Sequence, residues 1–294
     1  YTGILSFGHV MFFGIGAYSV ALLLGKYAQP TYLYLFLGFV VAMIVTMALA
    51  LLIGFLSLRV KAIFFAMVTL AIAEFAIILA TKLSGFTGGE DGIIMSTPGI
   101  FKVSFNMGSF MGVDITGRII TYYFTLAICL ILFLLMVRFI QSPLGRVMQA
   151  VRDNEPRAEA IGYKTFVFKA TSICFGCLVA TILGGLYVMW VGYANPESVL
   201  GVPIMLDVLL MVIIGGMGTL YGALAGAAFL RLAYTFLPDL QNLAQDLFPN
   251  LPFVHSIMER WLLIFGILFI LVVFFFPKGI IGTIQNRLKA KNAT

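Results

Sequence analysis

Residues 119–137 read IITYYFTLAICLILFLLMV, nineteen residues without a single charge. As a helix rising about 1.5 Å per residue, this run is long enough to cross roughly 30 Å of hydrocarbon. It does not alternate in polarity, as the strands of a membrane barrel do. The fold class predicted is therefore all-α, a polytopic membrane protein. Further uncharged runs occupy residues 1–25, 29–58, 170–196 and 208–230.

The composition favours the same fold class, because 62% of the residues are hydrophobic and only 10% are charged. Soluble domains are about half apolar and about a quarter charged. We expect the chain to form a single membrane domain, residues 1–294, whose natural N-terminus lies upstream of Tyr1, since the chain begins inside apolar sequence. We expect about eight transmembrane segments, at residues 3–24, 32–57, 62–80, 119–137, 166–191, 204–218, 219–237 and 257–277.

Charge is concentrated between two of these segments. Residues 138–169 hold six cations and three anions, with long uncharged runs on either side. If the spans alternate, twelve Lys and Arg residues, including those of this segment and of the basic tail 278–294, fall on one side and five on the other. The positive-inside rule places the twelve-cation side in the cytoplasm. Residues 138–165 then form a cytoplasmic loop and residues 81–117 an external loop. Because the cations are concentrated in a few loops, we interpret the net charge of +6 as a sign of membrane topology and not of nucleic-acid binding.

The external loop carries a strand-like pattern. Phe101, Val103 and Phe105 alternate with polar residues, which is the period of a β-strand. Val113–Thr116 follows after a stretch that contains glycine. We therefore predict a small external β-hairpin made of these two segments.

Local rules predict a short helix inside the cytoplasmic loop. Asp153 or Asn154 can cap its start, because their side chains accept hydrogen bonds from the first free N–H groups. Pro156 fits the first turn of such a helix, and Gly162 is a natural stop. The predicted helix is Glu155–Ile161.

Charge and polarity also fit this short helix. Glu155 and Glu159 lie near the positive end of its dipole. Ala158 and Ile161 give it a small apolar face at i, i+3 spacing. On this pattern alone, an ordinary solvated loop is the alternative.

A family resemblance bears on that choice. Residues 155–162, EPRAEAIG, resemble the cytoplasmic EAA-type loop of ABC importer permeases, in which a Glu-Ala pair is followed shortly by glycine. In that family the loop forms a coupling helix, which docks on the ATPase subunit. Pro156 departs from the family pattern, and this departure affects where the coupling helix would begin. More specifically, the chain resembles the M-type permease of branched-chain amino acid importers, which has the ABC importer permease fold. The separated segments that carry this resemblance are residues 5–18, 64–74, 87–92, 152–162, 195–198 and 210–226.

The resemblance implies a transmembrane permease domain within a heteromeric ATP-driven importer in the bacterial inner membrane, surrounded by membrane lipids. A homologous second permease would pair with it, two ATPase subunits would bind ATP and Mg, and a periplasmic binding protein would deliver branched-chain amino acids. No Walker motif occurs in the chain, so we expect no catalytic residue and no cofactor on it. The residues implied in coupling to the ATPase are Glu155, Arg157, Ala158, Glu159, Ala160 and Gly162.

The loop TGGEDG at residues 87–92 looks at first like a phosphate-binding loop. It lacks the Lys-Ser/Thr ending that such loops need, and the predicted topology places it outside the cell. We interpret it as a structured turn at the external mouth of the translocation pathway, where the binding protein would dock, with Thr87, Gly88 and Gly89 at that mouth.

Two acidic residues inside predicted spans are candidates for a functional role. Glu74 is in the third segment, where a carboxylate is costly and is by default a functional candidate, although a packing or gating role is an alternative to substrate contact. Asp207 is near the external end of the sixth segment, where we expect it to cap the helix. Arg231 could snorkel, or pair with either carboxylate.

Small residues and one histidine complete the candidate pathway. Gly14 and Gly16 near one end of the chain, and Gly215 and Gly216 near the other, permit close backbone approach or broken helices of the kind that line transporter pathways. Small-residue helix packing is the alternative. His9 is a further pathway candidate, although a lone histidine is more often packed than a ligand.

Four other interpretations are alternatives. Cys174 and Cys177 form a C-x-x-C pattern, but no second cysteine pair or nearby histidine completes a metal site, so we interpret them as core residues. An ion-coupled carrier using Glu74 as its proton site is the alternative from another class. Urea and short-chain amide importers use similar permeases, so the substrate is the least specific expectation. An intramembrane enzyme lacks a supporting constellation of residues.

Overall fold

The computed structural model describes residues 2–4, 6–25, 30–57, 62–110, 113–247 and 260–276, together with Gly279 and Gly282. It divides into two compact units, unit 1 (Tyr1–Met205) and unit 2 (Leu206–Thr294), which are described separately below. The predicted basic tail 278–294 lies outside the described residues, apart from those two glycines.

The described residues confirm the all-α fold class. Six helical stretches are long and apolar enough to cross a membrane, namely Tyr32–Ser57, Ile63–Lys82, Gly117–Gln141, Thr165–Val191, Pro196–Gly215 and Leu220–Asp239. Two shorter apolar helices, His9–Gly25 and Leu263–Val272, coincide with the first and last predicted segments. Each of the eight predicted segments therefore contains a helix among the residues that the structure describes.

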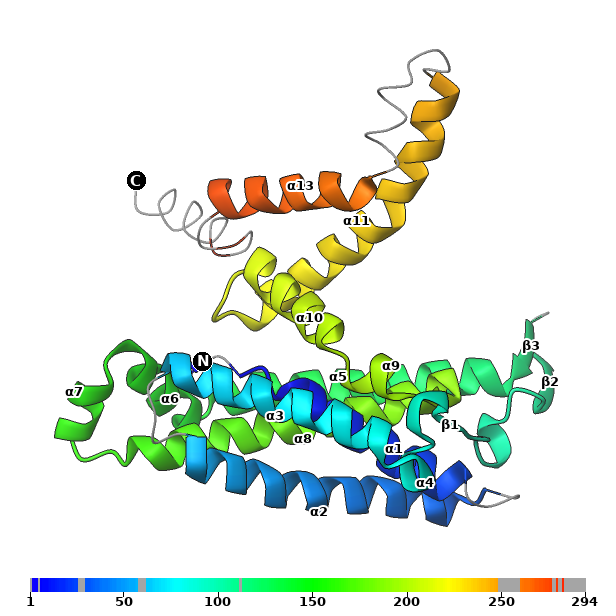
Figure 1. The fold of residues 1–294 in the computed structure, drawn as a ribbon, viewed down its shortest axis with the longest axis horizontal. Helices are drawn as coiled ribbons and strands as arrows, with labels where there is room; N and C mark the ends of the chain where they lie inside the picture. The colour runs from blue at the N-terminus through cyan, green and yellow to red at the C-terminus, as the bar shows by residue number, and fades with distance from the viewer. Residues whose placement is uncertain are drawn as a thin grey trace. The chain divides into compact units, whose positions relative to one another are not determined.

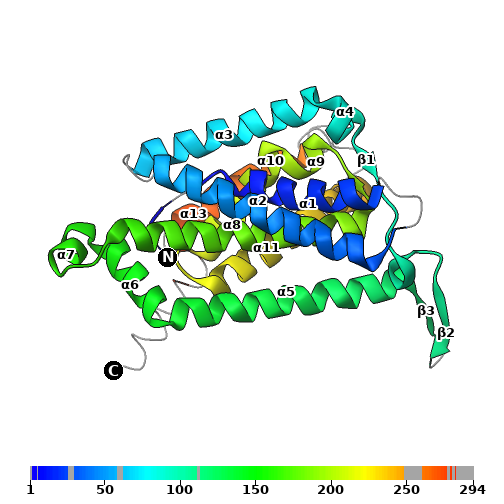
Figure 2. The same cartoon turned by 90° about the horizontal axis from the view of Figure 1, so that it is seen from below.

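Unit 1 contains most of the helices. The long ones are α1 (His9–Gly25), α2 (Tyr32–Ser57), α3 (Ala62–Lys82), α5 (Gly117–Gln141) and α8 (Thr165–Val191). The shorter ones are α4 (Ser84–Thr87), α6 (Pro143–Asp153), α7 (Glu155–Ala160) and α9 (Pro196–Leu200), and α10 (Val202–Gly215) begins in this unit. Figure 2 shows α3 and α5 at two edges of the unit, with α1, α2 and α8 between them.

The core of unit 1 lies where α1 packs against α2 and α8. Glycines let the α1 and α8 backbones approach closely, since a Cβ atom on Gly16 would collide with the Thr181 carbonyl and one on Gly184 with the Phe13 carbonyl. At the same crossing, the buried hydroxyls of Thr46 and Thr181 are 2.7 Å apart and hydrogen-bonded, which ties α2 to α8. Small residues and buried hydroxyl pairs are typical of helix contacts in membranes.

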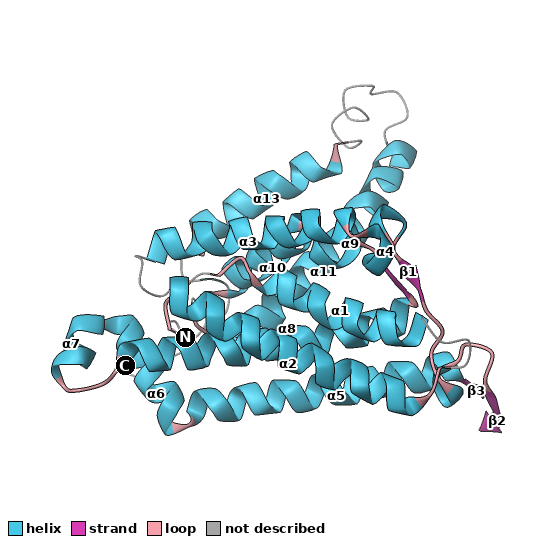
Figure 3. Cartoon of the chain, turned by 60° about the horizontal axis from the view of Figure 1, so that its bottom comes forward, coloured by secondary structure: helices cyan, strands magenta, loops and turns pink. Residues whose placement is uncertain are grey.

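The two ends of unit 1 differ in structure. Figure 1 shows α7 at one end and the strands β2 (Asn106–Phe110) and β3 (Val113–Thr116) at the other, and Figure 3 shows strands only at that second end. Two further strands, β1 (Ile93–Ile94) and β4 (Tyr193–Ala194), form a separate antiparallel pair. These opposite ends correspond to the predicted cytoplasmic and external loops.

The predicted hairpin exists, but its first strand was predicted in the wrong place. The pairing joins Asn106 to Thr116 and Phe110 to Val113, so the strand covers residues 106–110 and not 101–105. Residues 99–101 form a 3₁₀ turn, in which the Thr97 hydroxyl donates to the Phe101 carbonyl at 2.7 Å. Phe101 is buried with its ring centroid 5.0 Å from that of Phe124, so its apolar character reflects core packing.

Unit 2 contains the remainder of α10, α11 (Leu220–Leu247) and α13 (Trp261–Phe275). Ile214, Leu230 and Phe265 form its buried apolar cluster. The turn between α10 and α11 uses glycines in the left-handed region, with φ of 113° at Gly216 and 91° at Gly218. This turn confirms the predicted boundary between the sixth and seventh segments.

Candidate functional site

The predicted helix in the cytoplasmic loop is present as α7. Asn154 is its cap, because its Oδ1 atom accepts a hydrogen bond of 3.0 Å from the Arg157 N–H. The helix ends at Ala160, one residue earlier than predicted, and Gly162 follows with φ of 100°. A side chain is strained at that angle, so glycine is the residue that allows the chain to turn back toward α8.

A second helix, α6, precedes α7 and was missed in the sequence. Ser142 caps it by accepting a hydrogen bond of 3.3 Å from the Gly145 N–H, and Pro143 occupies its first turn. Met148 and Val151 are buried at i, i+3 spacing. The Ser-Pro pair followed by this spacing is an N-terminal helix signal and could have identified α6.

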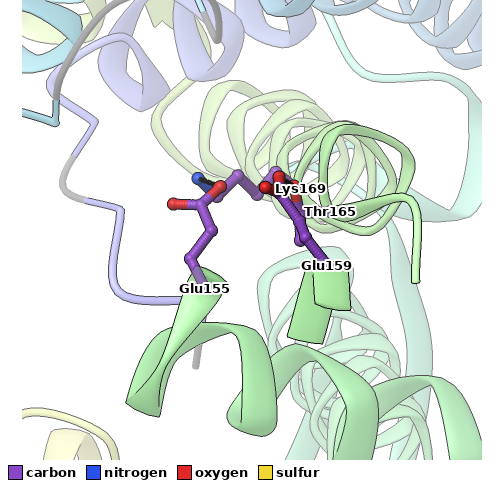
Figure 4. Close-up of polar contacts among 4 residues, drawn as sticks. All are labelled: Glu155, Glu159, Thr165 and Lys169. Carbon is purple, nitrogen blue, oxygen red and sulfur yellow. Dashed lines mark hydrogen bonds and ion pairs between the residues drawn. The ribbon is translucent and has the colours of Figure 1, made fainter. Parts of the chain in front are cut away.

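The two glutamates of α7 face α8. Figure 4 shows both side chains directed at the first turns of α8, where Glu155 forms an ion pair with Lys169 and Glu159 accepts a hydrogen bond of 2.7 Å from the Thr165 hydroxyl. These two contacts attach the short helix to the start of a long membrane-spanning helix. Lys169 and Thr165 were not among the predicted site residues, because their partners lie 14 and 6 residues away in the chain.

The opposite side of α7 is open. Arg157 and Ala160 are exposed, whereas Ala158 is only 5% exposed and packs inward. Ile161, which was expected to share an apolar face with Ala158, is instead 70% exposed. That prediction was wrong: Ile161 is the C-terminal cap of the helix, and its side chain is left uncovered although its backbone keeps the helical conformation.

Exposed apolar residues continue from Ile161 into the start of α8. Tyr163, Phe166 and Val167 are each exposed to solvent in the isolated chain. Together with Ile161 they form a patch, beside the exposed face of α7, at the predicted cytoplasmic end of unit 1. Apolar patches of this kind mark surfaces that contact another protein.

Glu74 is exposed in the middle of α3. Met67 and Ile78 on the same face, and the adjacent Phe75, are large, apolar and also exposed. Within the described part of the chain, no hydrogen bond or ion pair reaches the Glu74 carboxylate. A carboxylate at this depth is costly when it faces lipid.

His9 and the two glycines of α1 lie at helix contacts. The His9 Nδ1 atom is 3.3 Å from the Ser6 carbonyl oxygen, and its Nε2 atom lies 2.9 Å from the position that a Cβ on Gly176 would take. A Cβ on Gly14 would meet the Leu200 side chain, and Gly16 contacts α8 as described above. Gly14 and Gly16 therefore allow close approach to neighbouring parts of the chain. Their role in a pathway stays a prediction.

Asp207 does not cap a helix. It lies inside α10, which begins at Val202, and its Oδ1 atom accepts a hydrogen bond of 3.0 Å from the Tyr234 hydroxyl on α11. The capping prediction was wrong because the helix extends further toward the N-terminus than hydropathy alone indicated. Gly215 ends α10, and its position would not accept a Cβ because the Gly222 carbonyl lies against it.

The loop at residues 87–92 is a structured turn, as predicted. Thr87 is buried and its hydroxyl donates to the Leu83 carbonyl at 2.9 Å and to the Ala80 carbonyl. Gly88 and Gly89 adopt φ of 77° and 62°. The Tyr193 hydroxyl donates to the Asp91 carbonyl at 2.8 Å, so the loop is attached to β4 at the end of α8.

Comparisons with known proteins agree with this geometry. A family model described as "Branched-chain amino acid transport system / permease component" matches residues 1–273. The high-affinity branched-chain amino acid transport system permease protein LivM of Salmonella typhimurium is 28% identical, over 99% of this chain and 67% of that protein. LivM of Escherichia coli is 27% identical over the same shares, and the probable LivM of Methanocaldococcus jannaschii is 26% identical over 91% and 69%. No solved structure matches the chain significantly.

Proposed function

Because this chain belongs to the branched-chain amino acid transport permease family, we propose that it is the membrane-spanning permease subunit of an ATP-driven importer for leucine, isoleucine and valine. It would pair with a homologous permease in the bacterial inner membrane. Two ATPase subunits would hydrolyse ATP, and a periplasmic binding protein would deliver the substrate. The observation that carries this proposal is the capped helix α7, fixed to α8 by two side-chain contacts.

The arrangement of α7 suits a coupling element. Its exposed residues Arg157 and Ala160, with the neighbouring Ile161, would contact the ATPase subunit. The side that carries Glu155 and Glu159 is joined to α8, which packs along α1 and α2 in the core of unit 1. Displacement of α7 would therefore move α8, and the driving energy comes from different contacts with two states of the ATPase.

Transport by purified proteins distinguishes the proposed importer from its alternatives. We expect leucine uptake into proteoliposomes only when the second permease, both ATPase subunits, the binding protein and ATP are all present, and no competition from urea. Uptake by the permease alone under a proton gradient would instead establish an ion-coupled carrier. ATP-dependent uptake of urea without uptake of leucine would establish an amide importer.

We include Glu74 in the translocation pathway, on a face of α3 that would meet the second permease or the substrate. A charged side chain facing lipid at a helix centre costs about 2.5–3.5 kcal/mol, so this face is better suited to a polar surrounding. The carboxylate could then receive the ammonium group of an amino acid. His9, Gly14, Gly16, Asp207, Gly215 and Gly216 stay as further predicted pathway residues, and residues 87–89 as the predicted mouth.

Replacement of Glu74 by glutamine tests that assignment. We expect an assembled complex whose apparent KM for leucine rises roughly tenfold or more, because a hydrogen bond to a charged group contributes about 1.5–3 kcal/mol. Concentration-dependent uptake by reconstituted complexes provides the measurement. Asp114→Asn is the matched control, since Asp114 is also exposed but lies in the hairpin strand β3, outside the predicted pathway and mouth. Wild-type kinetics for Glu74→Gln would remove this residue from the pathway.

A further inference from the structure

A cavity of about 610 Å³ opens at the predicted external end of unit 1. Three parts of the chain form its walls: the loop at residues 95–104, the first turn of α5 and the last turn of α8. The walls are held together by hydrogen bonds and ring contacts, since the Met95 N–H donates to the Gly192 carbonyl at 3.0 Å and Phe101 packs on Phe124. The cavity is thus a formed feature of the fold.

The charges around this cavity have one sign. Lys102 and Arg118 line it, and among the residues that the structure describes no aspartate or glutamate does. Both cations are exposed, and neither forms an ion pair with another described residue. Ser96 and Ser104, which also line the cavity and are exposed, supply hydroxyl groups. Two cations with neighbouring hydroxyls are donors suited to a phosphate group.

The position of the cavity along the helices is that of the membrane interface. Arg118 is the second residue of α5, and Trp190 is the last but one of α8, so both line the cavity at the ends of spanning helices. The Trp190 ring lies 6.0 Å from that of Tyr122, centroid to centroid. Aromatic residues at this depth are typical of the level of lipid headgroups.

An apolar surface continues from the cavity into the membrane. Tyr122, Leu126 and Leu130 follow one another at i, i+4 spacing along α5, and each is about half exposed. Residues four apart lie on the same helix face. A molecule with a phosphate in the cavity could therefore lay an acyl chain along this face.

We propose that this cavity binds the headgroup of an anionic phospholipid, with the phosphodiester held by Lys102 and Arg118 and an acyl chain on the exposed face of α5. Free phosphate would use the cations but not the apolar face. The site lies on unit 1 alone and does not depend on which solute the permease transports.

Lipid retention measures this site directly. The complete complex is purified from membranes that contain phosphatidylglycerol, and the phosphatidylglycerol that stays bound is quantified by native mass spectrometry. We expect the double variant Lys102→Gln/Arg118→Gln to bind it about thirtyfold more weakly, since each basic residue near an anionic surface contributes about 1 kcal/mol. Lys102→Arg/Arg118→Lys keeps both charges and is expected to bind like the wild type.

Two further experiments test whether the site is specific and whether its ligand is a lipid headgroup or free phosphate. Lys82→Gln removes an exposed cation that does not line the cavity, and it should leave retention unchanged. Inorganic phosphate at millimolar concentration should not displace the lipid. The proposal is overturned if the double variant retains phosphatidylglycerol normally, if phosphate alone displaces it, or if the double variant weakens binding-protein docking without changing lipid retention.

Discussion

Replacing Glu159 with lysine is expected to reduce ATP-driven leucine uptake sharply while the assembled complex continues to hydrolyse ATP. The Glu159 carboxylate accepts a hydrogen bond from the Thr165 hydroxyl, and a lysine ammonium group cannot accept one. Loss of a hydrogen bond to a charged group costs about 1.5–3 kcal/mol, so we expect uptake to fall roughly ten- to a hundredfold. Uptake and phosphate release, measured on the same proteoliposomes, give the number of leucines transported per ATP.

Matched variants separate coupling from folding. Thr165→Ser keeps the hydroxyl and should transport normally, whereas Thr165→Val should resemble Glu159→Lys. Asp153→Lys also reverses a charge near α7, but Asp153 is exposed and pairs only with its neighbour Arg152 among the described residues, so we expect little effect. Normal uptake by Glu159→Lys would show that coupling does not pass through this contact.

Gly162→Pro should uncouple the complex for a different reason. Proline fixes φ near about −65°, whereas Gly162 adopts 100°. Its N–H also donates to the Glu159 carbonyl at 2.8 Å, and proline has no N–H to donate. Both effects would change the angle at which the chain leaves α7 for α8, while the core of the unit, formed by α1, α2 and α8, stays unaltered.

The spans were predictable because each is a local property. A run such as residues 119–137 needs only its own length and lack of charge to form a membrane helix, and the structure places α5 over residues 117–141. The cap of α7 was equally local, since Asn154 acts on an N–H three residues away. Resemblance to a known family, and not local chemistry, is what suggested an ATPase as the proposed partner of that helix.

The features that the sequence did not reveal all depend on distant residues. Asp207 looked like a cap because its hydrogen-bond partner Tyr234 lies 27 residues further on. The alternation around Phe101 looked like a strand because its buried contact with Phe124 is not visible in the local pattern. The attachment of Glu155 to Lys169 required knowing how the chain turns back at Gly162.

Gly16→Leu in α1 and Gly184→Leu in α8 are expected to give the largest loss of stability in the chain. Any Cβ at either position would collide with a backbone carbonyl of the facing helix, and a backbone cannot move aside as a flexible side chain can. The helices would have to separate, which would also disrupt the hydrogen bond between Thr46 and Thr181. Overpacking costs about 1–3 kcal/mol even in more adaptable cores, so we expect at least the upper value.

Thermal unfolding of the purified complex measures this loss, and a fall in Tm of roughly 6–12 °C corresponds to about 3 kcal/mol in a domain of this size. Gly266→Leu in α13 is the matched control, because no atom of the described residues lies within 4 Å of the position of its Cβ, and this variant should unfold like the wild type. The same measurement distinguishes the two interpretations of Gly16. If Gly16 lines the pathway without supporting the helix contact, Gly16→Leu will block uptake and leave Tm unchanged. If the contact between α1 and α8 is what requires glycine, Tm and uptake will fall together, and Gly184→Leu will reproduce both changes from the opposite helix.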